Sequence, residues 1–426
     1  MNRNCIFVLM QYRIFSYLLS GIVLIGLCPG CDWLPQQTNQ RRDIILTKTE
    51  QALSAEANRF AFDLFQQVNS EDRNYFISPL SASLALSMTA NGTGGETAAQ
   101  MKDVLGFEAF SYEQMNGFFK KISGELKQAD QLTELGIANS VWILEGFPVY
   151  EKFKDIVRLW YGAQIEELNF FSPTAVQTIN NWCSSKTNGK IEEIIDEIPP
   201  SMVMYLINAL YFKGIWTYSF DKSASYRDVF YGDDGSSPLS DYMIQTETYP
   251  YLEHELCQVA ELPYGNEAFS MVVMLPKPGV HVDRMIKEFM NTEQWNFLVS
   301  SLENFERKLT LSMPKFRFEY EKDLIPTLQT MGMTIPFMEG MADFSNMSPS
   351  GGLYIGLVKQ KTYVEVNEEG TEAAAVTVVG VEKSSIEPDD PLPFYVNRSF
   401  VYIIKEKSTG IILFMGKMSS LNQDPA

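Results

Sequence analysis

The residue types that most often carry enzymatic chemistry are few in this chain and poorly placed for it. Its two histidines, His254 and His281, belong to no H-E-x-x-H pattern and to no Cys/His cluster with metal spacing. The stretch NEEGTE, residues 367–372, holds three carboxylates that could suggest glycosidase acid/base chemistry, although adjacent carboxylates on one segment are usually just solvated. No G-x-S-x-G elbow, P-loop or dinucleotide fingerprint occurs. We therefore predict a protein that is not an enzyme and that needs no metal or cofactor.

The cysteines offer one further catalytic interpretation. Cys28 and Cys31, in CPGC, have the C-x-x-C spacing of a thiol–disulfide motif. Such a motif needs a helix N-terminus beside a strand to lower the thiol pKa. Here the pair instead stands at the end of an apolar segment near the N-terminus, and Cys5 lies before that segment. A thiol enzyme stays a minor alternative, which a mature chain beginning at or after Cys31 would exclude. Cys183 and Cys257 are too few for a disulfide framework and are expected to be small buried residues.

The first 30 residues have the pattern of an export signal. Arg3 and Arg13 supply the positive charge, residues 14–27 are apolar, and small residues precede Cys31. The pattern resembles a bacterial lipoprotein signal, in which the cysteine after the cut is acylated, although Cys28 stands where that pattern usually has leucine. We expect residues 1–30 to be the signal, residues 31–46 a polar tether and residues 47–426 one domain. The protein would be exported and lipid-anchored in the envelope, facing the periplasm or the cell surface, or be extracellular.

The net charge of the chain limits the classes of partner that it can bind. The formal net charge is −19, and removing residues 1–30 leaves 32 of the 34 basic residues against 53 acidic ones. Nucleic acid is excluded, because phosphate binding needs a basic face, and so is a polybasic attachment to anionic lipid.

Hydrophobic periodicity predicts one mixed α+β domain with its helices concentrated early. An apolar stripe at helical spacing over residues 53–68 follows a capping box of Thr47 and Glu50. A second helix begins after Ser78, which caps it. Residues 259–276 and 400–417 read as hairpins, and a slip in the alternation at Pro314-Lys315 predicts a β-bulge.

One segment near the C-terminus looks built to lie outside a sheet. NEEGTEAAAVTVVGVEKSS, residues 367–385, alternates small and β-branched residues without charge from Ala373 to Val381. A charged, proline-rich stretch follows it. An edge strand already paired in a sheet is the alternative, but the crowded charges and prolines of the tail favour a loop.

The body of the chain resembles a serpin from about Ala57 to Lys417. The quoted motifs, in chain order, are NYFISPLSASLALSMTANGTGGETAAQM, LGIANSVWI, INNWCSSKTNGKI, INALYFKGIWTYSF, LPYGNEAFSMVVMLP, MPKFRFE, LQTMGMTIPF with ADFS, and FVYIIKEKSTGIILFMGK. Any one would be weak, but eight in order are highly specific. The resemblance implies three β-sheets with eight or nine helices and an exposed reactive-centre loop. A protease that cuts this loop forms an acyl-enzyme, and the cut loop enters the central sheet and distorts the protease.

The loop has the composition that such an insertion needs. Alternate side chains of an inserted strand face the core, and from Thr371 to Val381 that face is small or β-branched and uncharged. Gly370 supplies a hinge that can take unusual backbone angles. The hinge residues that the resemblance implies are Glu368, Glu369, Gly370, Thr371, Glu372, Ala373, Ala374, Ala375 and Val376. No proline or bulky charge interrupts them, which favours an inhibitor over a non-inhibitory member of the family.

The family's spacing places the scissile bond between Ser384 and Ser385. Small residues there resemble bait for elastase- or subtilisin-like proteases. A shift of one residue would make Lys383 the target of a trypsin-like protease, and a protease could also choose Val379 or Val381. Cysteine proteases stay open as further targets.

The resemblance also assigns residues that control insertion. Ser78, Ser81 and Asn208 match the residues under the point where the sheet opens, and Gln360 stands where the family usually has histidine. Glu368 and Lys315 match a pair at the top of the sheet, next to Trp216. The predicted function is a monomeric serine-protease inhibitor that forms a covalent complex, with a non-inhibitory serpin-fold binding protein as the alternative.

Overall fold

The computed structural model describes residues 40–69, 73–371 and 390–421, and the residues from 40 onward belong to one compact unit. The predicted signal, with Cys28 and Cys31, lies outside the described residues. So do the hinge residues Glu372 to Val376 and the predicted scissile bond, with Lys383, Ser384 and Ser385.

Nine α-helices are present in the described ranges, as the sequence led us to expect. They are α1 (Lys48–Asn69), α2 (Pro79–Ala90), α3 (Gly95–Leu105), α4 (Tyr112–Leu126), α5 (Glu151–Tyr161), α6 (Ala175–Lys186), α7 (Val282–Phe289), α8 (Thr292–Asn304) and α9 (Ile325–Thr330). The predicted caps are confirmed, because the Thr47 backbone N–H donates to the Glu50 carboxylate at 2.7 Å and the Ser81 N–H donates to Ser78 Oγ at 3.3 Å. Within the described residues, no helix is both long enough and apolar enough to span a bilayer.

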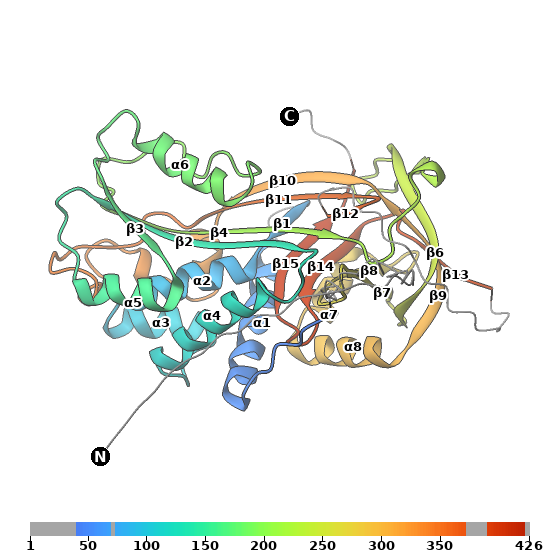
Figure 1. The fold of residues 1–426 in the computed structure, drawn as a ribbon, viewed down its shortest axis with the longest axis horizontal. Coiled ribbons are helices and arrows are strands. Elements are labelled where there is room, and N and C mark those ends of the chain that lie inside the picture. The colour runs from blue at the N-terminus through green and yellow to red at the C-terminus, as the bar shows by residue number, and fades with distance from the viewer. Residues whose placement is uncertain (1–39, 70–72, 372–389, 422–426) are drawn as a thin grey trace, which may run out of the picture. The chain divides into compact units, whose positions relative to one another are not determined.

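A six-stranded sheet runs through the middle of the unit in the order β10-β11-β12-β4-β2-β3. Its strands are β2 (Glu134–Leu144), β3 (Gln164–Leu168), β4 (Met204–Ile215), β10 (Phe316–Asp323), β11 (Lys359–Asn367) and the two-residue β12 (Gly370–Thr371). Figure 1 shows α2 on one side of this sheet and α6 on the other.

A nine-stranded sheet has the order β1-β15-β14-β8-β7-β6-β9-β13, with β5 paired to β6. Its strands are β1 (Tyr75–Ile77), β5 (Tyr226–Val229), β6 (Leu239–Glu253), β7 (Cys257–Tyr264), β8 (Phe269–Pro276), β9 (Glu306–Pro314), β13 (Leu392–Tyr395), β14 (Phe400–Glu406) and β15 (Ile412–Met418). One part of β6 pairs with β9 and its last three residues pair with β7, so β6 joins two layers. With the six-stranded sheet, these layers correspond to the three sheets that the resemblance implies. Both predicted hairpins, β7–β8 and β14–β15, are confirmed.

The predicted β-bulge at Pro314-Lys315 is wrong. β9 ends at Pro314 and pairs with β6, whereas β10 begins at Phe316 and pairs with β11 in the other sheet. The alternation slips because the chain leaves one sheet for another at Lys315.

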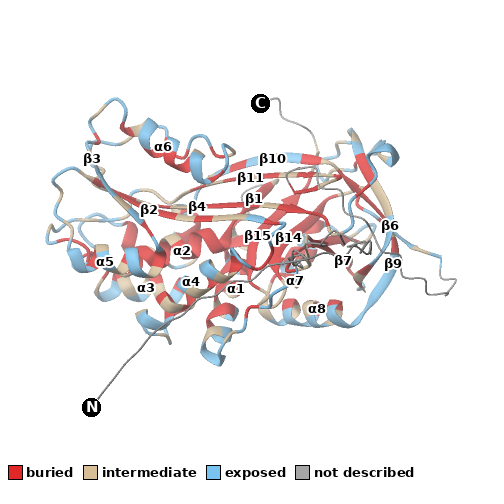
Figure 2. Cartoon of the chain, in the orientation of Figure 1, coloured by how far each residue is buried: buried red, intermediate tan, exposed pale blue. Residues whose placement is uncertain are grey.

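Burial is concentrated where the two sheets and the early helices meet. Phe60 and Phe65 of α1, Met88 of α2 and Val272 of β8 are fully buried. Figure 2 shows the inner strands and α2 as buried, with exposed residues on the outward sides of α6 and α8. The described end of the predicted tether also contacts the unit, because Ile44 is buried and its backbone N–H donates to Ser408 Oγ at 2.8 Å.

Candidate functional site

The six-stranded sheet is open between β4 and β11, and the predicted hinge occupies the top of the opening. Gly370 pairs with Asn367 of β11 on one side and with Ile215 of β4 on the other, both antiparallel. Thr371 likewise pairs with Val366 and Gly214. In the described ranges, no pairing of β4 with β11 follows below β12. The first two residues of the predicted ribbon are thus already strand residues between two partners.

Thr371 is fixed by aromatic residues under the sheet. It is 3% exposed, and its hydroxyl shares a hydrogen bond of 2.6 Å with the hydroxyl of Tyr264. The Tyr264 ring stacks on Trp216 with ring centroids 4.5 Å apart. Burial raises the pKa of the Tyr264 phenol, so this group stays protonated and neutral. The structure confirms that Thr371 faces the core, and it adds Tyr264, which sequence reasoning did not find.

Only glycine fits at position 370. Its φ of 151° lies in a region that favours glycine, and an added Cβ would stand 2.0 Å from the carbonyl oxygen of Gly214. The close approach of β12 to β4 therefore depends on glycine at this position.

The two acidic residues at the start of the hinge, Glu368 and Glu369, each form an ion pair with a lysine. The Lys315 ammonium lies 3.1 Å from the Glu368 carboxylate, as predicted, and Ser225 Oγ donates to the same oxygen at 2.6 Å. Burial alone would raise the pKa of Glu368, but the hydrogen bonds from Ser225 and Lys315 outweigh it, so the pKa lies below its ordinary value. Glu369 forms a second ion pair, with Lys222.

Trp216 connects to the same turn from the opposite strand. Its indole N–H donates to the Asn367 carbonyl at 2.9 Å, and its backbone N–H donates to the Glu369 carbonyl at 2.9 Å. The predicted grouping of Glu368, Lys315 and Trp216 at the top of the sheet is confirmed in its geometry.

Gln360 and Ser78 form the contact under the opening. The Gln360 side-chain oxygen accepts from the Ser78 backbone N–H at 3.0 Å, and its amide nitrogen donates to the Ser78 carbonyl at 2.8 Å. Ser78 Oγ donates to the Leu413 carbonyl at 2.8 Å. An amide thus bridges both backbone groups of Ser78 without any titration.

Asn208 is not bonded to this contact. Its amide nitrogen donates to Asn139 Oδ1 at 2.8 Å, across the β4–β2 pairing. Within the described residues its Oδ1 is buried without a hydrogen-bond partner. Of the predicted set, Ser78, Ser81 and Gln360 are brought together, whereas Asn208 belongs to the opposite side of the opening.

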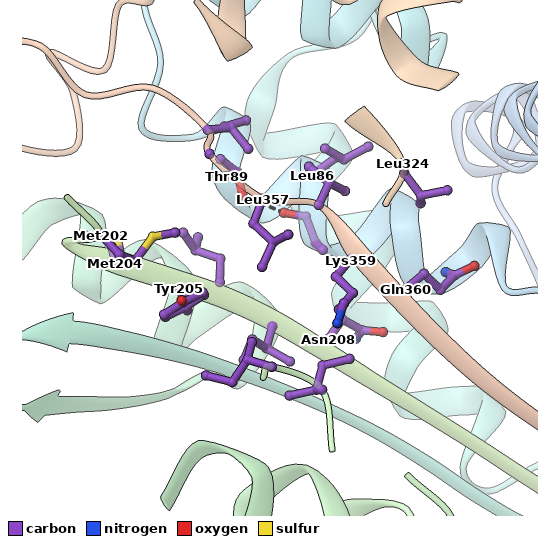
Figure 3. A pocket seen from close by; sticks show the side chains of 18 of the residues that line it. Leu86, Thr89, Met202, Met204, Tyr205, Asn208, Leu324, Leu357, Lys359 and Gln360 are labelled. Atoms are coloured by element: carbon purple, nitrogen blue, oxygen red, sulfur yellow. Dashed lines mark hydrogen bonds between the residues drawn. The ribbon is translucent and has the colours of Figure 1, made fainter. Parts of the chain in front are cut away.

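A cavity of about 550 Å³ lies in the opening below β12. Figure 3 shows it between β4, which carries Met204 and Asn208, and β11, which carries Lys359 and Gln360. We call this opening the slot. Residues 204–210 of β4 bound it on one side, and Val358 with the first residues of β11, 359–362, bound it on the other. Residues of α2 line its inner side.

Among the described residues, the histidines and cysteines that could have carried enzymatic chemistry are not assembled into one site. Cys183 and Cys257 are buried and free, and burial raises the pKa of each thiol to about 12, so neither is a ready nucleophile. His254 packs against Phe289, and His281 caps α7. In the part of the chain that the structure describes, no His, Cys, Asp and Glu cluster could hold a metal ion.

The structure thus shows a six-stranded sheet with a short hinge strand, β12, paired on both sides above a cavity between β4 and β11. Comparison with known proteins gives the family. The family model for serpins, serine protease inhibitors, matches residues 55–421. An uncharacterized serpin-like protein of Thermococcus kodakarensis is 31% identical, over 93% of this chain and 96% of its own length.

Comparison with solved structures gives the same family. The thermophilic serpin tengpin in its native state has a TM-score of 0.79 at 34% identity, covering 90% of this chain and 97% of its own. Human thyroxine-binding globulin complexed with thyroxine has a TM-score of 0.78 at 28% identity, covering 88% and 100%. The chain belongs to the serpin family, whose members are generally inhibitors of serine proteases rather than enzymes.

Proposed function

We propose that this protein inhibits a serine endopeptidase as a suicide substrate. The protease hydroxyl attacks the carbonyl carbon of the residue before the scissile bond, Ser384, and the amine of Ser385 leaves with a proton. The ester that remains is the acyl-enzyme. Insertion of the released end into the slot then competes with hydrolysis of that ester. The observation that carries the proposal is β12, which is paired on both sides at the top of the slot, where no further strand of the described residues lies between β4 and β11.

Continuing the register of β12 supports the predicted inward face. Two-residue steps from Thr371 would set Ala373, Ala375 and Thr377 opposite Phe212, Leu210 and Asn208 of β4. The same steps reach Val364, Thr362 and Gln360 of β11, all buried. In this register the Thr377 hydroxyl would meet the two amide side chains of the slot, including the unpartnered Asn208 Oδ1. Residues 370–381 also match the 12 residues of β4 in length.

The energetic basis is kinetic stability. Among the described residues, no strand lies between β4 and β11 below β12, so the form with a filled slot has more sheet pairing. The uncut protein persists because reaching that form requires the loop to be released, which is a barrier rather than an equilibrium preference.

The test is incubation with pancreatic elastase and with subtilisin. We expect an SDS-stable complex, a released C-terminal peptide that begins at Ser385, and a midpoint of thermal unfolding that rises by at least about 10 °C after the loop is cut. A trypsin complex with a peptide beginning at Ser384 would move the target bond to Lys383. Cleavage without a complex and without a gain in heat resistance would refute the proposal.

A binding protein of the same fold is the second candidate, because the similar thyroxine-binding globulin structure holds thyroxine. It predicts that every protease cuts the loop without forming an SDS-stable complex.

We also propose that the chain is exported and anchored through Cys31. Support comes from the basic, apolar and small-residue order of the first 31 residues. Radiolabelled fatty acid should be incorporated into the wild type and not into Cys31→Ser, which should appear in the medium or the soluble fraction. Equal labelling of both would contradict the anchor.

A further inference from the structure

The chain contains three Asn-Gly pairs, and the structure places them in different settings. Asn91-Gly92 follows α2, Asn116-Gly117 lies within α4, and Asn188-Gly189 lies in the turn after α6 (Figure 1). An asparagine before a glycine can react with its own backbone, because glycine has no side chain that blocks the approach of its nitrogen. The three pairs are therefore alike in chemistry and differ in their surroundings.

Asn188 and Gly189 project from a turn that is anchored on both sides. The Thr187 hydroxyl is buried and donates to the Cys183 carbonyl at 3.0 Å, and the Ile191 backbone N–H donates to the same hydroxyl at 3.1 Å. Between these anchors Asn188 and Gly189 are both exposed, and a Cβ added to Gly189 would meet no atom within 4 Å. Asn188 has a φ of 49°, in the left-handed region that a residue with a side chain adopts only at a cost. The turn thus has room to rearrange.

The other two asparagines are held in one hydrogen-bonded network. The Asn91 amide nitrogen donates to Asn116 Oδ1 at 3.0 Å, and the Asn116 amide nitrogen donates back to Asn91 Oδ1 at 2.8 Å. The Tyr161 hydroxyl also donates to Asn116 Oδ1, at 2.7 Å. Gly92 is tightly packed as well, because an added Cβ would stand 2.7 Å from the Met347 side chain. Both asparagines must lose several hydrogen bonds before their side chains can move.

We infer that Asn188 is a site of spontaneous deamidation. The backbone nitrogen of Gly189 bonds to Cγ of Asn188, the Cγ–Nδ2 bond breaks, and the side-chain nitrogen leaves as ammonia with the proton that the Gly189 nitrogen gives up. The product is a five-membered succinimide ring. Water then opens either carbonyl of the ring and leaves aspartate or isoaspartate at this position. The reaction consumes one water and releases one ammonia, so it needs no oxidant or cofactor.

The hydrogen bonds that oppose the reaction are fewer at Asn188 than at the other two sites. The Gly189 N–H donates to an α6 carbonyl at 2.9 Å, and the Asn188 side chain donates to the Glu134 carboxylate at 3.1 Å. Asn91 and Asn116 each make at least two more side-chain hydrogen bonds than Asn188 does. Each such bond slows the rearrangement by about fivefold, so these two asparagines should react at least about 25-fold more slowly.

Deamidation would place a new carboxylate beside Glu134. Glu134 is the first residue of β2, and one of its carboxylate oxygens lies 3.4 Å from the ammonium of Lys213 on β4. The other oxygen accepts the hydrogen bond from Asn188. After deamidation two like charges meet where a hydrogen bond stood, which separates the turn after α6 from the start of β2.

The experiment incubates the folded protein at mildly alkaline pH in water enriched in heavy oxygen and measures each Asn-Gly peptide by mass spectrometry. The heavy oxygen marks conversion during the incubation, and isoaspartate, resolved by chromatography, marks the ring. The same protein unfolded in urea gives the intrinsic rate of each pair. Asn188→Gln is the matched control, because glutamine would have to close a less favourable six-membered ring.

In the folded protein, Asn188 should convert at least about 25-fold faster than Asn91 or Asn116 and give both aspartate and isoaspartate. In urea the three pairs should convert at similar rates, and the glutamine of Asn188→Gln should stay unconverted. Equal rates for the three pairs in the folded protein would overturn the inference. So would the absence of conversion at Asn188 over a period in which the unfolded chain converts.

The consequence for β2 has its own measurement. Asn188→Asp supplies the product from the start, and its amide hydrogen exchange at residues 134–136 should be about fivefold faster than in Asn188→Gln. Equal exchange in the two variants would show that the new charge does not loosen the start of β2. None of these measurements uses a protease, so their outcome is independent of the proposed function.

Discussion

Thr371 gives the sharpest test of insertion, because it is the last described residue of the hinge and the first that faces the core. Thr371→Arg would put a cation at a position that is 3% exposed, against the neutral hydroxyl of Tyr264. An uncompensated buried charge costs about 4 kcal/mol. Because Thr371 is already buried in the uncut protein, we expect the arginine variant to release β12 from the sheet before the loop is cut. Returning the cation to the sheet during insertion then costs these ~4 kcal/mol and slows entry about a thousandfold, since ~1.4 kcal/mol corresponds to a factor of ten in rate.

The acyl-enzyme should then hydrolyse before the loop is inserted. We expect Thr371→Arg to be cut by elastase or subtilisin with little SDS-stable complex, measured as the ratio of complex to cleaved inhibitor on a gel. Thr371→Ser keeps the hydroxyl that contacts Tyr264 and should retain the wild-type ratio. A wild-type yield of complex from Thr371→Arg would show that a charge at this position does not hinder insertion, and the reasoning would be wrong.

Three further changes test the residues around the slot. Gly370→Ala forces a Cβ against a backbone carbonyl of β4 and should destabilise the hinge pairing by about 2 kcal/mol, seen as faster hydrogen exchange at residues 369–371 and a reduced yield of complex. The pKa of Glu368 is lowered in the folded state, so its stabilisation is present above about pH 4.5 and is lost as the pH falls below that; Lys315→Met should flatten this part of the urea stability profile, and an unchanged profile would contradict the pair's role. Gln360→His places a titrating ring against the Ser78 N–H, which needs an acceptor. The pKa of the new imidazole in the folded state should fall below ~6.5, so the variant should lose stability more steeply than the wild type as the pH drops through that value.

Local patterns were enough to predict several of the elements. The apolar stripe of α1, the capping Ser78 and the two hairpins are each decided by residues close together in the chain, and all are found. The order of the motifs predicted the family, and the family resemblance in turn predicted the ion pair of Glu368 and Lys315.

Local sequence patterns could not predict contacts between segments that are distant in the chain. The slip at Lys315 looked like a bulge because periodicity reports which side a residue faces, not which sheet its strand joins. Tyr264 gave no signal of its role, because its contact with Thr371 joins residues 107 positions apart.

The sequence by itself determined the family, the early helices and a segment without charge from Ala373 to Val381, because composition and short-range spacing are properties of the chain alone. Only the tertiary structure decided that β12 is already paired on both sides, that Gln360 holds Ser78 across 282 residues, and that Asn208 bonds across to β2 instead. Those outcomes depend on which strands become neighbours, and that is settled by the packing of the whole core around the six-stranded sheet.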